Sequence, residues 1–225
     1  MKRNQLRGIS TFEFAMSLMV LVPLILGTGA IGVNLIRTMQ TVQLARDAGH
    51  MYAKGVDFSQ EGNQAILGTI GNSMGLNTVV DTGTAIVILT ALTYVDSNTC
   101  IAAGAATNGV PNGTCVNLGK WVFAQRLTIG NSSLRTSNFG SPLTTGPTGV
   151  TLDNQGKISV TQYATKAGAV AQFSSANGIN PYTVVNNVVS GLPSGQRLYL
   201  AEAAGQGFGM PPFVAGSPTY SFAFF

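Results

Sequence analysis

The most constraining feature of this chain is an uncharged apolar run near its N-terminus. From Phe14 to Ile36 no side chain is ionisable. A helix of that length can cross the roughly 30 Å hydrocarbon layer of a membrane. Three basic residues precede the run: Lys2, Arg3 and Arg7. This basic flank predicts that the N-terminus stays in the cytoplasm and that everything after Arg37 is exported.

A glycine and a glutamate stand just before the apolar run. Gly8 follows the three cations, and Glu13 comes five residues later, at the edge of the run. A carboxylate at the edge of a membrane helix costs free energy, and it therefore marks a functional position by default.

This N-terminus resembles that of type IV prepilins and pseudopilins. In those proteins a membrane-embedded prepilin peptidase cuts a short basic leader after a glycine. A glutamate at the fifth mature position then pairs with the N-terminal amine of a neighbouring subunit. The resemblance implies a cut between Gly8 and Ile9, and it implies subunit assembly through Glu13 and the adjoining Phe14.

Among these families the chain is similar to the TadE/TadF-like minor pilins of tight-adherence pili. Their helices begin with a Glu-Phe-Ala sequence, like residues 13–15 here, and pass through a proline, like Pro23. An Ala- and Arg-rich amphipathic stretch follows, like residues 43–48. Near the C-terminus they often carry an apolar strand with a glutamate, like Glu202 within residues 198–203. The resemblance implies a pilus subunit that partners with other pilin or pseudopilin subunits and supports adhesion.

Two other interpretations of the N-terminus remain open. A cleaved secretory signal has an apolar core of about 7–15 residues and a small-residue cleavage site. This run is longer, starts at Glu13, and ends in residues 34–37 without a clear Ala-x-Ala site. An ordinary signal anchor would contain the glutamate by accident. The chain would then be a monomeric membrane-anchored exported domain, such as an adhesin or an envelope protein.

Composition argues against a nucleic-acid partner. The sequence pI is about 9.3, but three of the twelve cations lie in the predicted leader, which leaves nine against eight acids. Near neutrality, the remainder has no basic footprint for nucleic acid. Charged residues make up only 9% of the chain, against roughly 25% in a typical soluble domain. This composition fits an exported region of strands and polar loops.

Two strings imitate catalytic or cofactor-binding motifs. Residues 27–32 match the G-x-G-x-x-G dinucleotide fingerprint, but they lie inside the apolar run and no repeating strand–helix units follow. Residues 71–75 match the G-x-S-x-G nucleophile elbow, which needs a histidine later in the chain. The single histidine, His50, comes earlier. The sequence therefore predicts no enzyme, no cofactor and no small-molecule substrate.

These features predict an α+β chain with four parts. Residues 1–8 form the leader, 9–37 the transmembrane helix, 38–56 an amphipathic extension, and 57–225 an exported α+β domain. The extension has apolar residues at three- and four-residue spacing and a stop signal at Gly55. Its apolar positions are Met39, Val42, Leu44, Ala45, Ala48, Met51 and Tyr52. A second short helix is expected over 59–75, with Ala65, Ile66, Ile70 and Met74 on its apolar side.

The exported domain is predicted to be a mostly antiparallel sheet packed on the amphipathic half of the long helix. Residues 84–95 and 120–129 read as a hairpin joined by 96–119, and residues 138–156 read as an irregular loop. Further strands are expected at 157–163, 196–203 and 219–225. Residues 180–189 fit either a helix or a strand.

The two cysteines, Cys100 and Cys115, both lie in the connection between the two best strands. Because an exported compartment is oxidising and a hairpin base brings its ends together, they favour a disulfide. Two free thiols are the alternative. Metal binding is disfavoured, since the chain has no third soft ligand and only one histidine.

Overall fold

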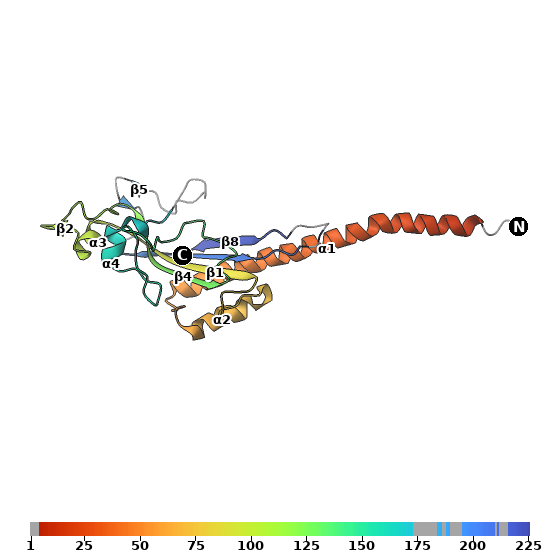
Figure 1. The fold of residues 1–225 in the computed structure, drawn as a ribbon, viewed down its shortest axis with the longest axis horizontal. Coiled ribbons are helices and arrows are strands. Elements are labelled where there is room, and N and C mark those ends of the chain that lie inside the picture. The colour runs from red at the N-terminus through yellow and green to blue at the C-terminus, as the bar shows by residue number, and fades with distance from the viewer. Residues whose placement is uncertain (1–4, 173–183, 186–187, 190–194, 210, 212–215) are drawn as a thin grey trace.

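The computed structural model shows a long helix that projects from a sheet domain, with the N-terminal end farthest from the sheet (Figure 1). It describes the backbone of residues 5–172, 184–185, 188–189, 195–209, 211 and 216–225, and the side chains from residue 12 onward outside 184–189. The α+β architecture predicted from the sequence is confirmed.

The long helix, α1, runs without interruption from Gln5 to Ala53. Gly55 ends it at a φ of 89°, in the left-handed region that favours glycine. Val56 N–H donates to the carbonyl of Met51, which closes the last turn. The predicted single rod and its stop signal are therefore confirmed. Pro23 lies inside the helix, where it removes one backbone N–H donor.

The domain follows α1 as one four-stranded sheet with short helices and two small ribbons. In chain order its elements are α2 (Glu61–Gly71), the 3₁₀ turn η1 (Asn72–Met74), β1 (Ala85–Tyr94), α3 (Ser97–Ala102), β2 (Ala106–Thr107), β3 (Val110–Pro111), β4 (Trp121–Gly130), α4 (Val160–Thr165), η2 (Ala167–Ala169), β5 (Val184–Val185), β6 (Val188–Val189), β7 (Arg197–Gly205) and β8 (Thr219–Phe224). The sheet order is β4-β1-β7-β8. All three neighbouring strand pairs are antiparallel.

The central strand β1 is apolar and rich in β-branched residues, which suits a strand covered on both faces. It pairs with β4 as the predicted hairpin, with a register shift between Ala91 and Leu92. The predicted strands at 84–95, 120–129, 196–203 and 219–225 are thereby confirmed, within one or two residues at most ends. The expected irregular loop over 138–156 carries no helix or strand.

One face of the sheet packs on the C-terminal half of α1 and on α2. Alternate residues of β1 point to this side, as the two-residue period of a strand requires. We call the resulting cluster the helix-side core. Its buried members are Leu44, Ala45, Ala48, Tyr52, Phe58, Leu67, Met74, Leu76, Ala85, Val87, Leu89, Ala91, Ile129, Ala201 and Ala203. The predicted packing of the sheet on the amphipathic half of α1 is confirmed.

Two details of the predicted apolar faces are wrong. Met39 is 59% exposed because it lies on the side of α1 opposite Leu44 and Ala48. On α2 the buried side chain is Leu67, while Ala65, Ile66 and Ile70 are exposed. Gly71 determines which face of α2 is buried, because a Cβ at Gly71 would stand 2.7 Å from the Leu76 side chain. Only a glycine at this position lets α2 lie this close to Leu76. Met74 is buried, as predicted.

The segment after β4 covers the opposite face and the free edge of β4. Arg126 N–H donates to the carbonyl of Gly156, and Ile158 N–H donates to the carbonyl of Ala124. Val122 also pairs with Val170 as an isolated bridge. These bonds satisfy backbone groups that an edge strand would otherwise expose.

The strand predicted over 157–163 is wrong. Lys157 forms only an isolated bridge to Gln125, and helix α4 begins at Val160. Ser159 caps α4, since its side chain accepts a hydrogen bond from the N–H of Gln162. A Ser N-cap thus outweighs a short alternating pattern. Of the predicted element at 180–189, the described part is the β5–β6 ribbon, and the rest lies outside the described residues.

Candidate functional site

The N-terminal half of α1 is the first candidate site. It is apolar and long enough to span a membrane, and only 6% of its most apolar window is buried in the protein. Phe14 is 65% exposed and Glu13 is also exposed. The Glu13 carboxylate is the only ionisable group between Phe12 and Ile36. This half of α1 therefore presents apolar surface to whatever surrounds it.

The predicted leader cleavage site lies at the start of this helix. The backbone of Gly8 and Ile9 belongs to α1, while their side-chain surroundings lie outside the described residues. The structure therefore places Gly8, Ile9, Glu13 and Phe14 on one continuous helix. Whether the leader is removed stays a prediction.

Glycines follow in the middle of the apolar run. A Cβ added at Gly27, Gly29 or Gly32 would meet no atom within 4 Å. The backbone of this turn of α1 is therefore open to close approach, as in membrane helices that pack through small residues. The fingerprint-like spacing of these glycines lies on a helix, without the strand-to-helix turn that binds a dinucleotide.

The domain meets α1 at a defined junction. The side-chain amide of Asn34 donates to the carbonyl of Phe208 (3.0 Å) and accepts from the N–H of Phe208 (2.8 Å). Arg37 donates to the carbonyl of Gln206 (2.5 Å). One turn later, the hydroxyls of Thr41 and Thr219 are 2.7 Å apart. The residues that follow β7 thus fasten the sheet to the helix near the end of the apolar run.

A disulfide joins Cys100 and Cys115, whose Cα atoms are 5.7 Å apart. Cys100 lies on α3 and Cys115 in the turn before β4. Both pack in a second core at the end of the sheet away from α1's projecting half, with Trp121 and Phe123. The predicted pairing is confirmed, and the free-thiol alternative is wrong.

A buried ion pair that the sequence patterns did not predict joins two strands. Arg126 on β4 and Glu202 on β7 flank β1 on the face opposite α1, and their side chains are 7% and 1% exposed. The Arg126 Nη1 atom is 3.9 Å from Glu202 Oε2. The guanidinium also donates to Thr90 Oγ1 (2.5 Å) and to the carbonyl of Gly140 (2.9 Å).

The Glu202 carboxylate is satisfied by the loop and by β8. It accepts from Ser137 Oγ (2.5 Å), from the N–H of Asn138 (3.1 Å) and from the Tyr220 hydroxyl (2.6 Å). Burial and the adjacent carboxylate raise the pKa of Tyr220, so the phenol keeps the proton that it donates. Burial lowers the pKa of Arg126, and Glu202 opposes that shift. The network holds residues 137–141 against the sheet. Its role is structural, because its charged side chains are buried and bond to the protein itself.

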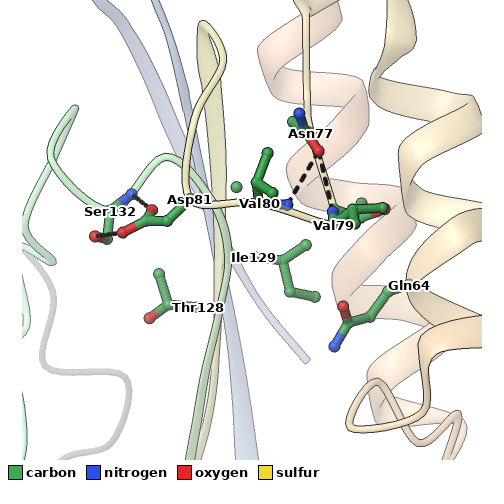
Figure 2. Close-up of a pocket in the computed structure, with 10 residues that line it drawn as sticks. Gln64, Asn77, Val79, Val80, Asp81, Thr128, Ile129 and Ser132 are labelled. Atoms are coloured by element: carbon green, nitrogen blue, oxygen red, sulfur yellow. Dashed lines mark hydrogen bonds between the residues drawn. The ribbon is translucent and has the colours of Figure 1, made fainter.

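A second candidate is an open hollow between α2, the loop over residues 76–84 and the end of β4 (Figure 2). Two of its polar side chains, Asp81 and Asn77, are engaged by neighbouring residues of the hollow. Both oxygens of Asp81 accept from Ser132, through its N–H (2.5 Å) and its hydroxyl (2.6 Å). These bonds lower the pKa of Asp81. Asn77 Oδ1 accepts from the N–H groups of Val79 and Val80.

The hollow holds one hydroxyl–carboxylate pair, Ser132 and Asp81, but the histidine that a Ser-His-Asp arrangement needs is not among its lining residues. Within the part of the chain that the structure describes, no group of three or more His, Cys, Asp and Glu side chains is placed to hold a metal ion. The G-x-S-x-G string forms the end of α2 and the turn η1, where the strand that a nucleophile elbow requires does not precede it. The sole histidine, His50, is exposed and stacks on Phe225, with ring centroids 5.4 Å apart.

Comparison of the chain with protein-family models, with curated proteins and with solved structures finds no significant match.

Proposed function

We propose that this chain is a minor pilin or pseudopilin that helps to build a surface pilus of the tight-adherence, type IV-like kind. It crosses the bacterial inner membrane once, with its N-terminus in the cytoplasm and its domain exported. One observation carries the proposal: the part of α1 from Phe12 to Ile36 is mostly exposed, apolar and uncharged except for Glu13. Such a surface needs lipid or other apolar helices around it.

The chemistry of assembly would be electrostatic. Removal of residues 1–8 by a prepilin peptidase would give Ile9 a free amine. Glu13 of a neighbouring subunit would then neutralise that amine inside an apolar bundle of helices. An unpaired charge there costs several kcal/mol, so the pair would fix the register of each added subunit.

The first test is the mass of the mature protein. Mass spectrometry of the purified chain should find an N-terminus at Ile9. Replacement of Gly8 by a bulky residue should leave a product that is eight residues longer, because the peptidase must close on the backbone there. A wild-type chain that retains Met1 would contradict the proposal.

The second test addresses Glu13. Glu13→Ala should permit insertion and cleavage yet reduce filament number and co-purification with other pilus subunits at matched protein levels. Glu13→Gln keeps the size of the side chain and loses its charge, so it should fail nearly as badly. Asp47→Ala is the matched control, since Asp47 is an exposed carboxylate of the same helix outside the apolar run. Normal filaments with Glu13→Ala would instead favour a monomeric anchored domain.

A further inference from the structure

The end of the sheet from which α1 projects has a defined set of elements. β1 and β8 begin there, and β4 and β7 end there. Gln206 links this end to the helix, because its N–H donates to the carbonyl of Thr84 (2.7 Å) while its own carbonyl accepts from Arg37 (2.5 Å). The loop over residues 76–84, which leads into β1, therefore lies at the end of the domain nearest the apolar half of α1.

Two neighbouring valines on this loop are exposed, and we call them the basal patch: Val79 (90% exposed) and Val80 (52%). The loop adjoins the Gly68 side of α2, because a Cβ at Gly68 would stand 3.3 Å from Thr78. Ile66 and Ile70 are also exposed, but each is two residues from Gly68 and therefore faces away from the loop. Contiguous exposed apolar residues mark a surface that contacts a partner or a membrane.

The loop holds its two valines outward by its own hydrogen bonds. Asn77 Oδ1 accepts from the N–H groups of both valines, and Leu76 bridges to Gly83 at the base of the loop. Asp81 is turned to Ser132, on the other side of the loop from Val79 (Figure 2). The neighbouring carboxylate is thus held away from Val79 by its two hydrogen bonds.

The length of α1 places the membrane boundary close to this patch. About twenty helical residues cross a hydrocarbon layer of about 30 Å. Counted from Phe12, which keeps Glu13 at the cytoplasmic edge, they end near Ile31. Asn34 and Arg37 then lie in the headgroup layer, and both are already bonded to the backbone that follows β7.

We propose that the basal patch rests on the outer surface of the lipid bilayer in which α1 is inserted. Thr84 ends the loop that carries the patch, and Gln206 bonds both to Thr84 and to Arg37, close to the point at which α1 would leave the membrane. Valine side chains gain free energy by entering the boundary between headgroups and acyl chains. The inference rests on the membrane insertion in the proposed function, and it does not require cleavage or filament assembly.

The test is a measurement of depth at Val79 in nanodiscs of phosphatidylethanolamine and phosphatidylglycerol. Both native cysteines are in the disulfide, so Val79→Cys supplies the only thiol for a nitroxide label. Val110→Cys is the matched control, because Val110 is 65% exposed on β3, which lies at the opposite end of the domain in Figure 1. Collision rates with oxygen, which partitions into lipid, and with a water-soluble nickel chelate are then compared.

With one chain per disc, the label at position 79 should collide several-fold less with the nickel chelate, relative to oxygen, than the label at position 110. Equal ratios at the two positions would overturn the proposal. Protection that appears only when discs hold two or more chains would also overturn it, because the patch would then contact a second copy. Retention of Met1 or normal filaments with Glu13→Ala would defeat the proposed function and leave this result untouched.

Discussion

The two halves of α1 have the same secondary structure and opposite surroundings. From Phe14 to Val33 the side chains are uncharged, mostly apolar around the whole helix and almost all exposed, whereas from Asn34 to Ala53 one face is buried under the sheet. Helical residues alone do not determine what covers a helix. The distribution of apolar side chains around its axis does: a one-sided stripe binds a sheet, and an all-round apolar surface needs a membrane or a bundle.

Two glutamates sharpen this comparison. Glu13 is exposed on the projecting half of α1, and beyond the helical bonds its backbone carbonyl accepts from Ser17 Oγ. Glu202 is buried at 1% exposure and accepts three hydrogen bonds beside Arg126. The first is exposed, and the proposed function gives it a role between subunits, whereas the second acts within one domain.

The largest effect on stability should come from Glu202→Ala. The substitution leaves the Arg126 guanidinium buried without its carboxylate partner, which typically lowers the free energy of unfolding by about 3–5 kcal/mol. Urea unfolding of the full chain in detergent micelles, followed by the fluorescence of Trp121, measures the loss. Glu13→Ala is the control and should leave the unfolding midpoint unchanged. Equal shifts of the unfolding midpoint in the two variants would show that Glu202 does not stabilise the domain more than Glu13 does.

Truncation of a leucine in each half of α1 should come next. Leu44 is 1% exposed and Leu24 is 61% exposed. Leu44→Ala should destabilise the domain by about 2–4 kcal/mol, because it removes buried methyl groups and leaves a cavity. Leu24→Ala should leave domain unfolding unchanged in the same assay. A loss of domain stability from Leu24→Ala would show that the projecting half also supports the fold.

Removal of the disulfide should have a comparable or smaller effect, confined to the end of the sheet away from the helix. The paired variant Cys100→Ser/Cys115→Ser should lose about 2–4 kcal/mol, since the reduced chain regains loop entropy on unfolding. Hydrogen exchange should rise in residues 96–119 and stay slow in the buried face of α1. Faster exchange at Leu44 and Ala48 would instead couple the two cores.

The smallest effect should appear at the boundary between the halves. Asn34→Ala removes two hydrogen bonds to Phe208, each worth about 0.5–1.5 kcal/mol. Exchange of the Phe208 amide should accelerate while the unfolding midpoint falls only slightly. Thr38→Ala is the control, because the Thr38 hydroxyl donates within α1, to the carbonyl of Asn34. Unchanged exchange at Phe208 in the Asn34 variant would show that the junction is held by other contacts.

Local patterns predicted most of this fold. The long helix, its stop at Gly55, the β1–β4 hairpin and the last two strands each follow from a short stretch of sequence. The prediction of a strand over 157–163 was wrong because Ser159 caps helix α4, and a short alternating pattern does not reveal that cap. The buried face of α2 was decided by Gly71, whose lack of a side chain matters only once Leu76 is beside it.

The ion pair could not be found in the same way, because Arg126 and Glu202 meet only through the register of a third strand. Thr90 of β1 pairs with Arg126, and Ile88 pairs with Glu202. A charged residue inside each of two apolar strands was the available signal. The predicted cleavage residues, Gly8 and Ile9, and the predicted assembly residues, Glu13 and Phe14, come from a resemblance, and their proposed roles depend on molecules outside this one.

The continuity of α1 has a mechanical consequence. The apolar segment and the segment that packs on the sheet belong to one helix, which is continuous from Gln5 to Ala53. Contacts at Asn34, Thr41 and Ala48 fix the orientation of the sheet around the helix axis. If the apolar segment is inserted in a bilayer as proposed, any tilt or rotation of the helix there must turn the whole domain with it. A force that turns the sheet domain would likewise be transmitted through the same helix to Glu13.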